Sequence, residues 1–114
     1  MIEYSFFIGR WQPWHEGHRW LIDQRLNEQK HVCIAIQDRE TDDRNPFTSE
    51  EVKNNIEREL KELIESGKVK VIIIPAIESV NYGRKVGYEI NEFVPPDEIN
   101  KISATNIRGK LNLD

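Results

Sequence analysis

The chain has few of the features that mark disulfide-rich, membrane or nucleic-acid-binding proteins. Cys33 is the one cysteine among 114 residues, which excludes an internal disulfide and a thiolate metal cluster. No apolar run approaches the roughly 20 residues that cross a bilayer. The 16 basic and 20 acidic residues give a net charge of −4, so no broad basic surface for nucleic acid is expected.

The chain also shows no sign of export or of a second domain. No basic region precedes the first apolar run, so no signal peptide is recognised and we expect a cytoplasmic protein with no membrane partner. A length of 114 residues is close to the commonest size of one domain, and no repeat or linker interrupts it. We therefore predict a single domain over residues 1–114.

Three apolar runs predict the strands of a parallel sheet. They cover residues 4–8 (YSFFI), 31–36 (HVCIAI) and 69–74 (VKVIII), and such continuous runs are typical of strands buried on both faces. Amphipathic stretches between them predict helices, one over residues 17–27 and one from a Thr48–Glu51 capping box to Gly67. Cys33 is predicted to be a buried thiol in the second strand.

This βαβαβ order predicts an α/β fold, a Rossmann-like three-layer α/β/α sandwich with a parallel sheet. A further strand over residues 88–94 and a helix over residues 103–111 are predicted to follow. In such sheets ligands bind beyond the carboxyl ends of the strands.

The segment at the end of the first strand, residues 9–18 (GRWQPWHEGH), has the strongest functional signal. Gly9 permits a tight turn, and the helix start that follows suits a phosphate group. His15 and His18 share one face of the first helical turn. Beside a polyphosphate the imidazoles would gain protons, donate hydrogen bonds and stabilise a leaving pyrophosphate. A zinc site lacks a third ligand of convincing spacing, so no protein-bound metal is expected.

Two other segments are candidates for binding anions or an acceptor. Ser103 and Thr105 offer hydroxyls at a helix start and Arg108 follows one turn later, which also describes a capped helix with a surface arginine.

The glycine-rich segment 81–88 carries Tyr82, Arg84 and Tyr88, which would recognise an acceptor or form only a surface turn. For Arg39 and Arg44 the sequence favours a solvated charged loop.

These motifs carry a family resemblance. Residues 9–18 resemble the G-R-F-Q-P-F-H-x-G-H signature of the nucleotidyltransferase superfamily, the cytidylyltransferase-like enzymes, with tryptophans at positions 11 and 14. Residues 102–108 (ISATNIR) look like the I-S-x-T-x-I-R motif of that family. Residues 45–48 (NPFT) are similar to a segment of archaeal-type nicotinamide mononucleotide adenylyltransferases.

The resemblance implies transfer of a nucleoside monophosphate, AMP from ATP in the first instance, to a small phosphate-bearing acceptor with release of pyrophosphate. Mg²⁺ would accompany the triphosphate. The residues that it implies for catalysis are His15, His18 and Arg108. The residues that it implies for nucleotide binding are Gly9, Arg10, Trp11, Gly17, His18, Ser103, Thr105 and Arg108.

The sequence also departs from the adenylyltransferase pattern. Val52 follows Glu51 where an arginine is common in those enzymes, and the chain is shorter than they are. The sequence therefore leaves open which nucleoside triphosphate donates the nucleotidyl group and which phosphate compound accepts it. The alternatives are a cytidylyltransferase using CTP and a polyol phosphate such as glycerol 3-phosphate, a catalytically inactive nucleotide-binding regulatory domain, or a module that works beside a partner enzyme. Relatives are often dimers or larger, so a homo-oligomer is compatible with the resemblance.

Overall fold

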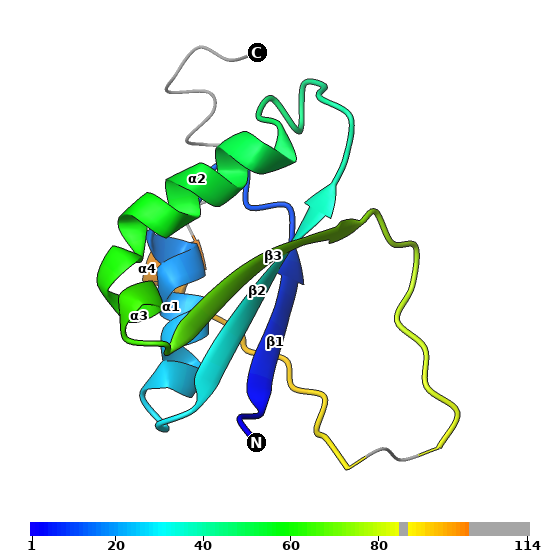
Figure 1. Cartoon of the computed structure of the whole chain (residues 1–114). Coiled ribbons are helices and arrows are strands. Elements are labelled where there is room, and N and C mark those ends of the chain that lie inside the picture. Colours follow the sequence, from blue (N-terminus) through cyan, green and yellow to red (C-terminus); the bar gives the residue numbers. More distant parts are fainter. Residues whose placement is uncertain (85–86, 101–114) are drawn as a thin grey trace.

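A parallel sheet of three strands is the centre of the fold (Figure 1). The computed structural model describes residues 1–84 and 87–100. Strands β1 (Tyr4–Gly9), β2 (His31–Asp38) and β3 (Val69–Pro75) lie side by side in that order, and both pairs are parallel. The three predicted strands are confirmed, each longer by one or two residues at its carboxyl end, and with them the Rossmann-like α/β fold.

Helices make both crossover connections. Helix α1 (Glu16–Leu26) joins β1 to β2, and α2 (Ser49–Glu59) with the short α3 (Lys61–Glu65) joins β2 to β3. The predicted capping box is present, because Thr48 Oγ1 accepts from the Glu51 N–H at 3.1 Å and Glu51 Oε1 accepts from the Thr48 N–H at 3.0 Å. The single helix predicted up to Gly67 is interrupted at Leu60, whose backbone (φ −112°, ψ 24°) leaves the helical region.

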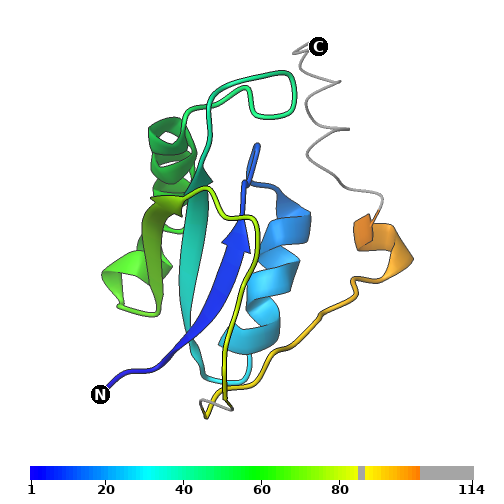
Figure 2. The ribbon, with the colours of Figure 1, turned by 90° about the vertical axis from the view of Figure 1, so that its right-hand side faces the viewer.

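The helices pack on one face of the sheet. Strand register places Phe7, Ile34 and Val71 side by side, and all three belong to the core that also contains residues of α1 and α2. Two right-handed crossovers that advance in the same direction put their helices on the same side. Figure 2 shows both helical connections behind the sheet, so the described residues supply the sheet and one helical layer.

The other face of the sheet is largely apolar but carries no helix among the described residues. On this face Phe6, Cys33 and Lys70 are neighbours, and Phe6 is 53% exposed. Cys33 is buried as predicted, and burial raises the pKa of its thiol. Cys33 is buried on this open face because β2 is the central strand, and the strands on either side shield its side chains.

Beyond β3 the described residues form no further strand or helix before the helical turn α4 (Asp97–Asn100), which contacts α1. The strand predicted over residues 88–94 is not formed: Tyr88, Ile90 and Val94 are 58%, 69% and 72% exposed. The alternating apolar pattern there finds no sheet edge, and two prolines that follow cannot donate ladder hydrogen bonds. The predicted helix over residues 103–111 lies outside the described residues. No helix within the described part is long and apolar enough to span a membrane.

The end of α3 is fixed by Gly67. Its φ of 79° lies in the left-handed region, its N–H donates to Ile64 O at 3.0 Å, and the Lys68 N–H donates to Leu63 O at 2.9 Å. This pair of bonds is a Schellman motif, which satisfies carbonyls that the helix end leaves open.

Replacing Gly67 by alanine is expected to lower the free energy of unfolding by about 1 kcal/mol, because an L-residue is strained in the left-handed region. A Cβ at Gly67 would meet nothing within 4 Å, so the cost is conformational and not steric. Urea unfolding measures it, with Gly83→Ala as the control, since Gly83 also faces open space but has no positive φ. Equal stability of the two variants would contradict this account.

Candidate functional site

The loop that joins β1 to α1 is built around the indole of Trp11. This side chain is 5% exposed, and its Nε1–H donates to the carbonyl of Ala35 in β2 at 3.1 Å. A Cβ at Gly9 would come within 2.8 Å of an indole ring carbon. The predicted reason for glycine at position 9 was a tight turn, whereas the structure shows that close approach of the indole requires it.

His15 and His18 lie together at the start of α1, as the spacing predicts. Their rings stack with centroids 3.7 Å apart at an interplanar angle of 21°. His15 is the N-cap residue, and its Nδ1 accepts from the Gly17 N–H at 3.0 Å. His18 Nδ1 accepts in turn from the His15 N–H at 3.3 Å, which completes a capping box built from two imidazoles.

These caps assign the tautomer of both rings. An imidazole nitrogen that accepts a hydrogen bond carries no proton, so in the neutral ring the proton is on the other nitrogen. Both Nδ1 atoms accept backbone N–H groups, and the free N–H of each ring is therefore on Nε2. The site therefore offers two imidazole N–H donors at the N-terminal end of a helix, where the helix dipole also favours an anion.

Burial favours the neutral form of both rings. Desolvation lowers the pKa of His15, and desolvation together with the neighbouring His15 lowers the pKa of His18 from 6.5 to about 3. The rings of Trp11 and Trp14 supply much of this apolar surrounding, with centroids 4.8 Å and 5.4 Å from that of His18. The proton gain predicted from the sequence concerns a bound polyphosphate and stays a prediction.

The second loop at this end of the sheet, residues 39–47, is held in a tight turn. Asp42 Oδ1 accepts from the backbone N–H groups of Arg44 and Asn45 and from Asn45 Nδ2, at 2.8, 2.7 and 3.0 Å. The Asn45 hydrogen bonds are the main reason why the pKa of Asp42 is lowered, and the charge of Arg10 adds to them. Arg10 therefore lies near this loop. Asn45 is 4% exposed, and its Oδ1 finds no partner within the described part of the chain.

The two loops are joined by Gln12, which sequence reasoning did not select. Its side-chain amide is hydrogen-bonded to the backbone of Phe47, 35 residues away. A polar residue between two tryptophans in an otherwise apolar turn was the available signal. A partner so distant along the chain gives no local pattern.

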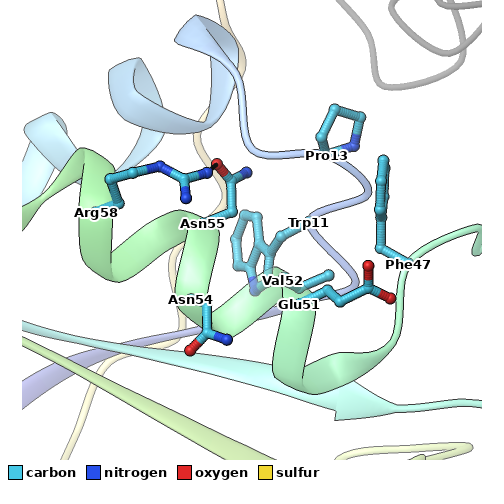
Figure 3. Close-up of a pocket in the computed structure, with 8 residues that line it drawn as sticks. All are labelled: Trp11, Pro13, Phe47, Glu51, Val52, Asn54, Asn55 and Arg58. Atoms are coloured by element: carbon cyan, nitrogen blue, oxygen red, sulfur yellow. Dashed lines mark hydrogen bonds between the residues drawn. The ribbon is translucent and has the colours of Figure 1, made fainter.

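A cavity of about 410 Å³ lies between α2 and the two loops that Gln12 joins (Figure 3). Aromatic and apolar side chains form one part and the polar side of α2 forms the other. The lining residues are Trp11, Pro13, Phe47, Glu51, Val52, Asn54, Asn55 and Arg58. The two histidines do not line it, so this cavity is separate from the imidazole pair.

The structure does not bring the predicted acceptor residues to the histidines. Tyr82, Arg84 and Tyr88 are exposed and belong to the segment that leaves β3 and turns away from the sheet (Figure 1). Ser103, Thr105 and Arg108 lie outside the described residues. Among the described residues no three His, Cys, Asp or Glu side chains form a group that could hold a metal ion.

Fold and site define an α/β protein with a Rossmann-like sheet and a pair of neutral imidazole donors at the start of its first helix. Comparison with known proteins finds similarity to an adenylyltransferase. The chain is 34% identical over 94 residues to a nicotinamide-nucleotide adenylyltransferase of Methanocorpusculum labreanum. The match covers 81% of this chain and 53% of that protein, so the chain spans about half the length of this relative. No protein-family model matches the chain.

The lowered pKa of His18 predicts how stability depends on pH. Below pH 6.5 the unfolded chain takes up a proton that the folded chain, with a pKa of about 3, does not. The free energy of unfolding should therefore fall between pH 6.5 and pH 3, by at most ~1.4 kcal/mol per pH unit from this group.

Urea unfolding from pH 7 to pH 5 tests this linkage. His18→Gln should lose part of the slope that the wild type shows, whereas the matched change His31→Gln at the start of β2 should keep it. A His18→Gln variant with the full slope of the wild type would show that another group causes the pH dependence.

Proposed function

We propose that the chain binds a nucleoside triphosphate at the start of α1 and transfers its nucleotidyl group to a small acceptor that carries a phosphate. The observation that carries the proposal is the imidazole pair: both rings are held by backbone N–H groups through Nδ1, which leaves Nε2–H groups to donate. The similarity to an adenylyltransferase supports it.

The step needs positioning and charge stabilisation more than proton transfer. An oxygen of the acceptor phosphate attacks the α-phosphorus and forms a new P–O–P linkage. The bond from the α-phosphorus to the bridging oxygen breaks, and pyrophosphate leaves with the electron pair. The attacking phosphate is already ionised, so no general base is required, and donors aimed at the leaving group stabilise the developing charge.

The donors fall into two groups. His15 and His18 would donate from Nε2 to phosphate oxygens. Ser103, Thr105 and Arg108 are proposed to hold the β- and γ-phosphates, as the resemblance to the I-S-x-T-x-I-R motif implies.

Mg²⁺ would arrive with the triphosphate. A magnesium ion on a nucleotide is held largely by phosphate oxygens and water, and it neutralises charge on the transferred group. The described residues fit this arrangement, because the imidazole pair is a donor set for anions and not a cage of carboxylates.

ATP and nicotinamide mononucleotide are proposed as the first pair to test, because the similar protein is named for that reaction. Val52, at the position where the archaeal-type adenylyltransferases often have an arginine, makes a change of acceptor a specific outcome to examine. CTP with glycerol 3-phosphate is the second pair. Binding of a triphosphate without turnover would instead identify a regulatory nucleotide-binding domain.

Replacing His15 by asparagine separates helix capping from catalysis. Asparagine at the N-cap can accept the Gly17 N–H, so α1 is expected to stay capped, but the Nε2–H donor is lost. Loss of one such donor should lower kcat by roughly 10²–10³-fold. Pyrophosphate release with Mg-ATP and nicotinamide mononucleotide measures kcat, and His31→Asn is the matched control.

Thermal-shift measurements with the Mg²⁺ complexes of ATP and CTP accompany the assay, since a ligand that binds the folded chain raises its melting temperature. No shift with either nucleotide and no pyrophosphate from either pair would overturn the proposed function. Full activity of His15→Asn would leave the reaction standing and remove His15 from its catalysis.

A further inference from the structure

We infer that Gln12 is a positioning residue that sets the relation between the two loops of the site. The inference rests on the proposed function. Gln12 is 6% exposed, its Nε2 donates to the Phe47 carbonyl at 2.8 Å, and its Oε1 accepts from the Phe47 N–H at 3.0 Å. One side-chain amide thus satisfies both peptide groups of a residue in another loop.

This pairing needs the glutamine amide in particular. Phe47 presents one backbone donor and one backbone acceptor, and the amides of Gln and Asn carry the complementary acceptor and donor side by side at any protonation state of the protein. Asparagine is shorter by one methylene group. Glutamate has the length but no donor when ionised, and one of its oxygens would face the Phe47 carbonyl. Breaking such a buried pair leaves polar groups unsatisfied.

One end of the bridge lies next to the imidazole pair and the other next to the start of α2. Gln12 follows Trp11, whose indole contacts the His18 ring with centroids 4.8 Å apart. Phe47 precedes Thr48, the N-cap of α2, and ends the loop of residues 39–47. A shift of Phe47 relative to Gln12 would therefore move that loop and the start of α2 relative to the imidazole pair.

Nucleotidyl transfer is sensitive to such a shift. The acceptor oxygen must approach the α-phosphorus from the side opposite the leaving pyrophosphate, so two substrates must be held in one alignment. A displacement of about 1 Å far from the reacting atoms can cost roughly 10²-fold in rate. The triphosphate would be held at the start of α1, which has its own capping box, so its affinity should depend little on the bridge.

The experiment compares the whole chain with three variants. Gln12→Leu removes both hydrogen bonds at similar volume, and Gln12→Glu removes the donor. Gln24→Leu is the control, because the Gln24 amide also donates to a backbone carbonyl, that of Trp20 at 2.9 Å, but within α1. The readouts are amide hydrogen exchange at Phe47, the Kd of Mg-ATP by calorimetry, and kcat and KM for pyrophosphate release with nicotinamide mononucleotide.

We expect at least tenfold faster exchange at Phe47 and at least a tenfold lower kcat in Gln12→Leu. Gln12→Glu should be intermediate, the Kd of Mg-ATP should stay within about twofold in both, and Gln24→Leu should match the wild type. These magnitudes follow from a lost local bond and a misaligned reaction.

Unchanged exchange at Phe47 would overturn the bridge, and unchanged kcat would overturn the positioning role. An equal loss in ATP affinity and kcat would also overturn it, because a general disturbance of the site has that result. If the wild type releases no pyrophosphate with either substrate pair and binds neither nucleotide, the proposed function fails and the positioning role with it, whereas the exchange data still decide whether the bridge exists.

Discussion

The burial of the Trp11 indole is the contact on which the rest of the site depends. Its N–H donates to the backbone of β2, its ring occupies the space beside Gly9 that a side chain would fill, and it meets the His18 ring in a T-shaped contact. One side chain therefore links the first two strands to the start of α1. The same ring also borders the cavity against α2, so four elements share a single apolar anchor.

This anchor explains the electrostatics of the histidines. An imidazole surrounded by indole rings loses the water that would stabilise its charge, and the lowered pKa of His18 follows from that loss. A neutral ring is a weaker hydrogen-bond donor than a charged one, but its tautomer is fixed by the backbone. The hydrogen bonds from these rings are thus weaker than those from a charged imidazole, but their direction is defined.

The sequence was sufficient for the features that depend on local patterns. Continuous apolar runs predicted the strands, and Thr48 with Glu51 predicted the start of α2, because both signals lie within a few residues. The interruption at Leu60, the unpaired segment around Ile90 and the bridge from Gln12 to Phe47 were not predictable in this way. Each depends on what lies across space, and in the case of Ile90 on a neighbouring strand that the described chain does not provide.

The double use of His15 and His18 restricts how this region can change. The two rings cap the start of α1, and the same hydrogen bonds direct their Nε2–H groups. The first residue of the helix and the direction of the donors are therefore set together. Inserting or deleting a residue between His15 and His18 would disrupt both the helix cap and the direction of the Nε2–H donors. The helix start and the direction of the donors therefore depend on the same three-residue interval, and neither can move along the chain without the other.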